Sequence, residues 1–273
     1  MSDWDPGPAW LFCPADRTDR YPKALAAADV VILDLEDAVA PDRKAAARDA
    51  VRAAASSSAW DPQRTVLRVN AASSPEHAAD LDLVRETGTR RVMLAKSESV
   101  AEVEAVPAEV VVLVETPRGL QSVDAIAAAA NVIAVFWGAD DLVAGLGGQS
   151  SRHVDGSYRD IARHARSRAL IAAKASGRIA LDAVHMDIPD LDGLTAECLD
   201  AVAIGFDATV AIHPSQIGAI RSAYAPTAAA VDWARRLLDH VGAARGVTTF
   251  EGRMVDGPIY AQAERILRRS ARA

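Results

Sequence analysis

The sequence predicts an α/β protein: a closed (β/α)₈ TIM barrel followed by a C-terminal helical extension. Short β-branched runs, typical of strands buried on both faces, alternate with helical patterns eight times along the chain. Four of these runs lead directly into acidic or basic side chains, as expected where the parallel strands of a barrel converge on one mouth. A doubly wound open sheet is the alternative, although eight units of this length usually close.

The individual elements follow from the positions of the apolar runs and of the patterns between them. Strands are expected over residues 10–13, 30–35, 65–69, 91–94, 110–114, 132–137, 178–181 and 209–212. Helices are expected over residues 21–28, 41–56, 75–87, 100–105, 119–130, 158–175, 195–204 and 215–224. Helix start signals, such as Ser74 before Pro75, support several of them. The catalytic barrel is therefore expected within residues 1–224.

Residues 225–273 lie outside the eight repeats and are expected to form a helical extension or lid. The pattern predicts a helix over residues 225–244, a Gly-rich stretch over 242–257 and a final helix over 258–269. The segment has too little apolar surface to be a free domain. We therefore expect it to pack on the barrel or on a neighbouring subunit.

The composition excludes several classes of protein. A net charge of −7 and a pI near 5.4 argue against a nucleic-acid partner. The first ten residues lack the pattern of a signal peptide, and no apolar run is long enough for a membrane span. We therefore expect a cytoplasmic protein with no membrane partner. Cys13 and Cys198 have neither zinc-site nor disulfide spacing and are expected to be small buried side chains.

Two acidic residues follow consecutive predicted strands, namely Glu115 and Asp141. A closed barrel would place them side by side at its mouth, where they would repel each other unless a cation lay between them. Two oxygen ligands that leave most of the coordination sphere open describe a Mg²⁺ site completed by water and substrate. The alternative is that Glu115 pairs with Arg118 and that Asp141 caps the short helix after it.

Charged side chains end two further strands. Asp34, Glu36 and Asp37 in the segment LDLED cannot all point one way, because alternate strand residues face opposite sides. We expect Glu36 and Asp37 to orient metal-bound water or to bind a cationic group, with helix capping as the alternative. Arg68 could clamp a carboxylate or stabilise an oxyanion. An ion pair between Arg68 and the LDLED carboxylates is the alternative and does not exclude that role.

Basic side chains gather past the first predicted strand. Arg17, Arg20 and Lys23 lie close together there, and Lys96 follows the fourth strand. Together they could hold phosphate groups, the alternative being a solvated basic face.

Two further signals are weaker. The Gly-rich residues 145–148 could present backbone N–H groups to a substrate carboxylate, or they could form a plain loop. His213 could be a ligand or a structural histidine.

Eight short segments resemble the citrate lyase β-subunit-like family, which is grouped with malyl-CoA and citramalyl-CoA lyases. In chain order they are LFCPADR (11–17), LDLEDAV (33–39), LRVNA (67–71), MLAKSES (93–99), LVETPRG (113–119), WGADDL (137–142), IHPSQI (212–217) and FEGRMVDGP (250–258). Each is a weak signal alone, but the ordered set spans nearly the whole chain. One departure is Ala95, where the family commonly has a proline, and it bears on local loop shape rather than on chemistry.

The resemblance implies a TIM barrel that acts on a coenzyme A thioester with Mg²⁺ on Glu115 and Asp141. It implies that Arg68 contacts the reacting end of the substrate. Substrate contacts are also implied at Glu115, Gly138 and Ala139. The implied coenzyme A contacts are Arg17, Arg20, Lys23, Lys96 and Pro214.

The resemblance also implies a shared site in a homotrimer or hexamer. Asp256, in the segment MVDGP, matches an acidic residue that reaches into a neighbouring subunit's site in the family's lyases.

The reaction implied is a reversible Claisen-type cleavage of a 3-hydroxyacyl-CoA of the citramalyl, malyl, citryl or 3-hydroxy-3-methylglutaryl type. It would release a keto acid and a short acyl-CoA enolate, whose charge Arg68 would offset and which Asp256 would protonate. Glu36 and Asp37 complete the expected catalytic set. The alternatives are a malyl-CoA thioesterase, a malate synthase-type side activity, a pyruvate-type aldolase acting on free acids, and a non-catalytic subunit that binds an acyl carrier.

Overall fold

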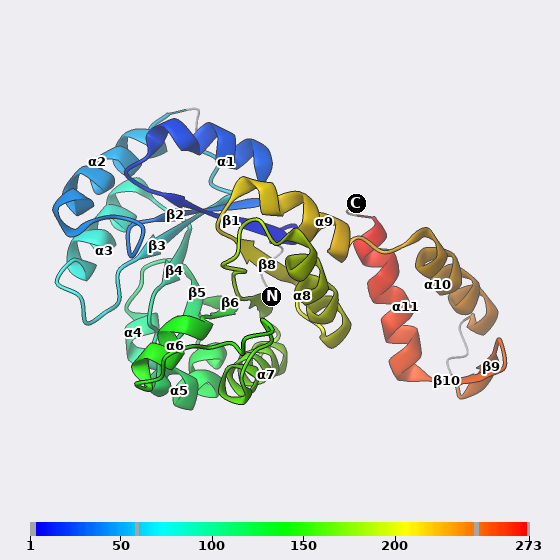
Figure 1. Cartoon of the computed structure of the whole chain (residues 1–273). Helices are drawn as coiled ribbons and strands as arrows, with labels where there is room; N and C mark the ends of the chain where they lie inside the picture. The colour runs from blue at the N-terminus through cyan, green and yellow to red at the C-terminus, as the bar shows by residue number, and fades with distance from the viewer. Residues whose placement is uncertain (1–3, 58–59, 243–245, 272–273) are drawn as a thin grey trace. The chain divides into compact units, whose positions relative to one another are not determined.

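Eight parallel strands pair in chain order and close into a barrel where β8 pairs with β1 (Figure 1). The computed structural model describes residues 4–57, 60–242 and 246–271. The strands are β1 (Ala9–Pro14), β2 (Val30–Asp34), β3 (Thr65–Val69), β4 (Arg91–Leu94), β5 (Glu109–Val114), β6 (Val132–Trp137), β7 (Ile179–Asp182) and β8 (Ala208–Ala211). The predicted barrel is confirmed and the open sheet is wrong. Each predicted strand end lies within one residue of the observed one.

Alternate residues of the strands fill the barrel interior, and this is why the strands read as apolar runs. On β2, Val30 and Ile32 belong to the interior cluster, whereas Val31 and Leu33 are buried on the opposite face. The same alternation puts Val111 of β5 in the interior. The fully or almost fully buried interior residues are Trp10, Val30, Ile32, Val66, Met93, Val111, Leu113, Ala134, Phe136, Leu181, Ala208 and Val210.

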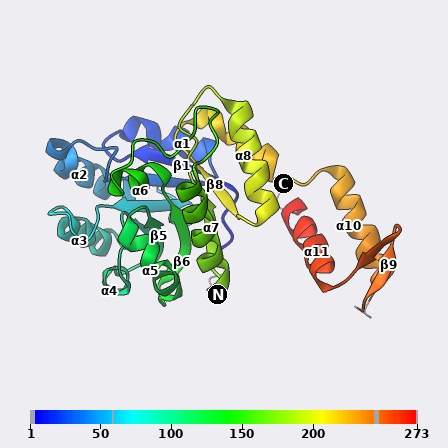
Figure 2. The same ribbon diagram turned by 60° about the horizontal axis from the view of Figure 1, so that its bottom comes forward.

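Helices lie outside the ring of strands, as Figure 2 shows. They are α1 (Tyr21–Ala27), α2 (Lys44–Ala55), α3 (His77–Thr87), α4 (Val100–Glu104), α5 (Pro117–Ala128), α7 (Asp160–Ala175), α8 (Leu191–Ile204) and α9 (Ile217–Tyr224), with 3₁₀ turns η1 (Thr18–Arg20), η2 (Pro41–Arg43) and η3 (Pro214–Gln216). Helix α8 begins four residues before the predicted start at 195, because the Asp190 side chain caps it by accepting a hydrogen bond from the Gly193 N–H (2.8 Å). A short extra helix, α6 (Ala139–Gly145), follows β6.

The chain divides into two compact units, Met1–Ile220 and Arg221–Ala273. The second unit holds α10 (Ala228–Val241) and α11 (Gly257–Ser270). The predicted end of the first of these helices, at residue 244, lies outside the described residues. Where this unit packs stays a prediction.

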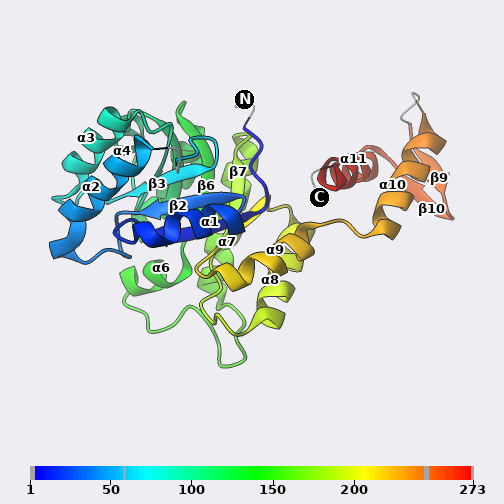
Figure 3. The same cartoon turned by 90° about the horizontal axis from the view of Figure 1, so that it is seen from above.

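A β-hairpin stands where only a Gly-rich stretch was predicted (Figure 3). It pairs β9 (Thr248–Phe250) with β10 (Arg253–Val255). The turn residues Glu251 and Gly252 have φ of +50° and +76°, the backbone that a tight hairpin turn requires. The hairpin and both helices share a small apolar cluster formed by Trp233, Ala234, Leu237, Leu238, Val241, Phe250, Val255, Ile259, Tyr260, Ala263, Ile266 and Leu267.

Two expectations from composition can be compared with the structure. Cys13 and Cys198 are both buried and free, as expected. Among the described residues, no helix has the length and apolar character needed to cross a membrane.

Candidate functional site

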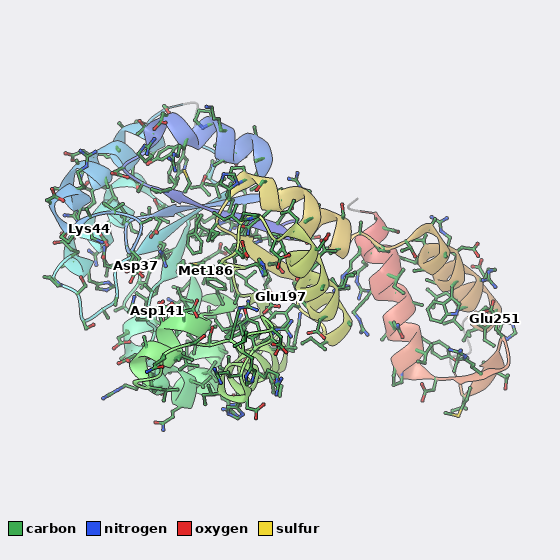
Figure 4. All side chains as sticks on the ribbon, viewed as in Figure 1. Asp37, Lys44, Asp141, Met186, Glu197 and Glu251 are labelled. Carbon is green, nitrogen blue, oxygen red and sulfur yellow. The ribbon has the colours of Figure 1, made fainter. Side chains whose placement is uncertain are left out.

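Five carboxylates meet at the C-terminal mouth of the barrel, and we call them the carboxylate cluster. Asp34 ends β2, and Glu36 and Asp37 follow it; Glu115 follows β5, and Asp141 lies in the first turn of α6. Figure 4 shows Asp37 and Asp141 at the same end of the barrel. The side chains of Asp34, Glu36 and Glu115 are buried, whereas Asp37 and Asp141 are exposed to solvent.

One ammonium group contacts four of these five carboxylates. Lys96 Nζ donates a hydrogen bond to Glu36 Oε1 and lies 3.5 Å from Asp37 Oδ2. It also lies 3.7 Å from Glu115 Oε1 and 3.8 Å from Asp141 Oδ1. Lys96 was predicted to hold phosphate groups together with Arg17, Arg20 and Lys23, and that role stays a prediction. The structure places its ammonium among acids that follow three different strands, β2, β5 and β6.

The backbone after β4 directs Lys96 to this position. Lys96 has φ of +50°, a left-handed conformation that non-glycine residues rarely adopt. Its N–H donates to Glu115 Oε1 (3.2 Å), and the next N–H, of Ser97, donates to the Leu113 carbonyl (3.0 Å). These bonds tie the turn after β4 to the end of β5, and so they hold the lysine beside Glu115.

Arg68 is anchored by Asp34, the LDLED carboxylate that was not among the predicted catalytic residues. The guanidinium donates through Nε and Nη2 to the two Asp34 oxygens (2.6 and 2.5 Å), and Nη1 lies 3.1 Å from Glu36 Oε2. It also stacks 4.5 Å from the centre of the Phe12 ring. The ion pair foreseen as an alternative is therefore present. Asp34 and Glu36 are two positions apart in LDLED, and side chains two positions apart on a strand face the same side. This spacing could have placed Asp34 on the same side as Glu36.

A buried polar network beneath the mouth supports the loops after β2 and β3, and its residues were not among those predicted from the sequence. Lys44 Nζ donates to the carbonyls of Leu35 (2.8 Å) and Glu36 (2.7 Å) and to Asn70 Oδ1 (2.9 Å). Asn70 in turn donates through its N–H and side-chain amide to Asp80 Oδ2 (2.9 and 2.6 Å). The Asn of LRVNA was the available signal, because a buried amide must be hydrogen-bonded.

A cavity of about 160 Å³ opens beside Glu115 and Asp141. Its other wall is aromatic: the Trp137 and Tyr158 rings meet edge to face at 5.4 Å, and Arg152 stacks 3.9 Å from the Tyr158 ring centre. Trp137 Nε1 donates to Asp182 Oδ1 (2.8 Å), which fixes the indole. The lining residues are Phe12, Arg68, Leu113, Glu115, Phe136, Trp137, Gly138, Ala139, Asp140, Asp141, Ser151, Arg152, Tyr158, Ala183, Val184 and Met186.

The charge of the cluster fits a divalent cation. Five carboxylates against Arg68 and Lys96 leave an excess of three negative charges when all are ionised. Burial, together with nearby Asp141, raises the pKa of Glu115 to about 8, although Lys96 lowers it. Within the part of the chain that the structure describes, Glu36 Oε2 is buried and accepts no hydrogen bond, although Arg68 Nη1 lies 3.1 Å away, and it could accept one from a metal-bound water.

The number of ligands fits Mg²⁺. Across the described ranges, no group of three or more His, Cys, Asp or Glu side chains has a metal-binding arrangement. A cation held by Glu115 and Asp141 alone would need water or substrate to complete its coordination, which is usual for Mg²⁺. The alternative roles predicted for Glu115 and Asp141, an ion pair with Arg118 and a helix cap, are not observed. Arg118 pairs with Glu98 (3.5 Å), and the start of α6 has no side-chain capping hydrogen bond.

Gly138 gives the Glu115 side chain the space it occupies. A Cβ at Gly138 would lie 2.8 Å from Glu115 Oε2 and 2.9 Å from Glu115 Cβ. Ala139, the first residue of α6, lines the cavity. The glycine in WGADDL is thus explained by close packing against Glu115, and the predicted substrate contacts of Gly138 and Ala139 stay predictions.

The residues predicted to hold phosphates lie on the surface after β1 and β8. Arg17, Arg20 and Lys23 are exposed on η1 and α1, and Arg17 pairs with Asp19 (3.3 Å). Pro214 is exposed at the start of η3. Unlike Lys96, these four side chains take no part in the carboxylate cluster.

Two weaker signals have structural explanations. The N–H groups of Gly147 and Gly148 donate to the carbonyls of Ala144 (2.9 Å) and Val143 (2.8 Å), which ends α6. These two N–H groups are engaged within the chain, which favours the alternative of a plain loop, and the suggested role in binding a substrate carboxylate stays an untested prediction. His213 Nδ1 accepts from the Ser215 N–H (3.2 Å) as the cap of η3, which is a structural role.

Asp256 lies in the second unit at the N-cap of α11. Its carbonyl accepts from the N–H groups of Ile259 and Tyr260 (both 3.1 Å), but its side chain makes no capping hydrogen bond. The carboxylate is half-buried and is not used to begin the helix.

Comparison with known proteins gives one matching family model, described as HpcH/HpaI aldolase/citrate lyase, over residues 9–214. A citrate lyase subunit beta-like protein of Mycobacterium tuberculosis is 54% identical over 268 residues, covering 98% of this chain and 97% of the relative. An L-malyl-CoA/beta-methylmalyl-CoA lyase of Cereibacter sphaeroides is 31% identical, covering 97% and 95%. The M. tuberculosis protein CitE, solved with magnesium, acetoacetate and coenzyme A, has a TM-score of 0.91 at 53% identity, covering 97% and 98%.

Replacing Gly138 should disturb metal binding without unfolding the barrel. In Gly138→Ala the new methyl group must push Glu115 aside, so we expect Mg²⁺ affinity to fall at least about tenfold and the free energy of unfolding to fall by about 1–3 kcal/mol. Titration calorimetry and urea unfolding measure both. Gly218→Ala is the matched control, because a Cβ there meets nothing within 4 Å. Unchanged Mg²⁺ affinity in Gly138→Ala would refute the packing argument.

Proposed function

The chain belongs to the HpcH/HpaI aldolase/citrate lyase family, and on that premise we propose that it is a Mg²⁺-dependent carbon–carbon lyase. Its substrate would be a 3-hydroxyacyl-CoA, cleaved to a keto acid and a short acyl-CoA. The observation that carries this proposal is the pairing of Glu115 and Asp141 beside a cavity that Arg68 also lines. The names of the relatives, which include lyases of malyl-CoA type, support the same chemistry.

Glu115 and Asp141 would hold the metal. When bound, Mg²⁺ would supply Lewis-acid polarisation of the oxygens that surround the scissile bond. Glu36, fixed by Lys96 and by the Lys44 bond to its carbonyl, would accept a hydrogen bond from water at the metal. Asp37, which is exposed, would contribute negative charge at the rim.

Arg68 would stabilise the negative charge that develops on the thioester oxygen. Asp34 accepts hydrogen bonds from two of the five N–H donors of the guanidinium, and Glu36 Oε2 lies 3.1 Å from Nη1. Because Arg68 also lines the cavity, a substrate oxygen there would share the guanidinium with these two carboxylates. Because Asp34 and Phe12 fix the guanidinium before substrate arrives, little reorganisation is needed during the reaction.

The cavity is large enough for the acyl part of the proposed substrate but not for its coenzyme A part. About 160 Å³ can enclose a small acyl group or keto acid, whereas drug-sized ligands need about 300 Å³ or more. Coenzyme A would therefore lie along the outer surface, where Arg17, Arg20 and Lys23 are exposed after β1. Arginine and lysine side chains there suit its phosphates.

The same small cavity supports a second candidate, an aldolase that acts on free acids. Such an enzyme would use Glu115, Asp141 and Arg68 in the same way but would need no basic surface after β1. Activity on free acids that exceeds activity on the matching thioesters would favour this alternative.

Loss of either proposed metal ligand should abolish turnover. For Glu115→Gln and Asp141→Asn we expect release of keto acid to fall by more than about 100-fold, the upper range for residues that only support a ligand. The assay uses malyl-, citramalyl-, citryl- and 3-hydroxy-3-methylglutaryl-CoA with Mg²⁺. Glu86→Gln, which removes an exposed carboxylate paired with Arg52, is the control. Full activity of either ligand variant in a chelator would rule the metal mechanism out.

Removing the basic surface after β1 should weaken binding of the thioester. With Arg17, Arg20 and Lys23 all changed to Gln, we expect KM for acyl-CoA to rise and to depend less on salt, since exposed charges are screened. Steady-state kinetics at several ionic strengths give both quantities. The matched control changes three exposed basic residues elsewhere, Arg52, Arg85 and Arg90. An equal rise in KM in the control would show a general charge effect instead of a binding surface.

Asp256 is proposed as the proton partner of the enolate, acting in a neighbouring subunit's site. Asp256→Asn should lower kcat by about 10²–10⁴-fold and leave Mg²⁺ and acyl-CoA affinity nearly unchanged, because Asn keeps the shape but exchanges no proton. Mixing inactive Asp256→Asn subunits with inactive Glu115→Gln subunits should restore activity in hybrid oligomers. If subunits are shown to exchange and no activity returns, Asp256 does not act across subunits.

A further inference from the structure

The lysine after β4 contacts both proposed metal ligands. Lys96 Nζ lies 3.7 Å from Glu115 Oε1 and 3.8 Å from Asp141 Oδ1, so one positive charge already lies beside both carboxylates. A cation held by the same two oxygens would come close to this ammonium. Two positive charges would then share a small volume.

The position of Lys96 is built into the backbone. The residue has φ of +50°, and its N–H donates to Glu115 Oε1 (3.2 Å). The turn also packs against the start of α5, where a Cβ at Gly119 would overlap the Ser97 carbonyl oxygen. Because several contacts maintain this rarely adopted backbone conformation, the position of the Lys96 side chain is determined by the fold and points to a functional role.

The ammonium of Lys96 offsets part of the negative charge of the carboxylate cluster. Without Lys96, five carboxylates would face Arg68 alone, and Arg68 is already engaged by Asp34. Glu36, which accepts a hydrogen bond from Nζ, remains as a partner for the ammonium when Glu115 and Asp141 bind another cation.

We propose that Lys96 is an internal counter-ion that holds Glu115 and Asp141 together before the metal binds and that competes with Mg²⁺ for them. This inference rests on the proposed Mg²⁺ site and adds a residue that lowers metal affinity. Lys96 is a positioning residue in this role. A purely structural lysine would have the opposite effect, because its removal would loosen the ligands and weaken Mg²⁺ binding.

The test is calorimetric titration of Mg²⁺ into the full chain at constant ionic strength. Lys96→Met removes the charge and keeps the length, so we expect Mg²⁺ to bind at least about tenfold more tightly, since a charge about 4 Å away is felt through partly solvated protein. Lys96→Arg keeps the charge and should bind Mg²⁺ with nearly wild-type affinity. Lys174→Met removes an exposed lysine that pairs with Asp207 and should have no effect.

A second readout is thermal unfolding with and without Mg²⁺. Without metal, Lys96→Met should melt below the wild type, because its carboxylates have lost a counter-ion; saturating Mg²⁺ should raise its melting temperature more than that of the wild type. Should Lys96→Met fail to fold, Lys96→Gln, which can still donate to Glu36, takes its place with the same expectation.

Three results would overturn the inference. They are unchanged or weaker Mg²⁺ binding in Lys96→Met (or in Lys96→Gln where it takes its place), tighter binding in Lys96→Arg, and an equal gain in Lys174→Met. A wild-type protein that binds no Mg²⁺ would instead refute the metal site itself, and with it the proposed function.

Discussion

Three buried carboxylates at one end of the barrel require nearby positive charge, because an ionised carboxylate is costly to bury unless it is paired. Asp34 pairs with Arg68, and Glu36 pairs with Arg68 and Lys96. Among the described residues, the cation within 4 Å of Glu115 is the ammonium of Lys96, at 3.7 Å, and Arg68 acts on Glu115 from farther away. Burial, followed by the nearby Asp141, raises the pKa of Glu115, and burial also raises the pKa of Glu36, so neither carboxylate is fully compensated. The position of each cation is therefore as important to this mouth as the position of each acid.

Those positions depend on polar and steric contacts outside the mouth. The buried ammonium of Lys44 holds the loop that carries Glu36, and Asn70 connects this loop to Asp80 on α3. At the ends of β5 and β6, the absence of a side chain at Gly138 allows Glu115 to approach the end of β6. These contacts join the end of β2 to the end of β3 and the end of β5 to the end of β6, so a substitution outside the carboxylate cluster can move a charge at the mouth.

Much of the fold could be predicted because its signals are local. The strand bounds follow from runs such as Val132–Trp137, in which β-branched and aromatic side chains are buried on both faces. The pair Glu115 and Asp141 also followed from strand order alone. The direction of Lys96 could not be predicted, because it depends on a left-handed backbone and on a hydrogen bond to a residue 19 positions away. The hairpin was missed because its turn requires positive φ at Glu251, where the sequence indicates only flexibility.

The excess of negative charge at the mouth also has a kinetic consequence. An acid substrate carries the same sign of charge as the carboxylate cluster, so Coulomb repulsion opposes its entry into an unloaded site. A divalent cation that binds first would neutralise two of the three excess charges present when all five carboxylates are ionised, and would add a local attraction for the incoming carboxylate. If the protein has the proposed function, the electrostatics of the free protein therefore favour an ordered rate law in which the metal binds before the acid.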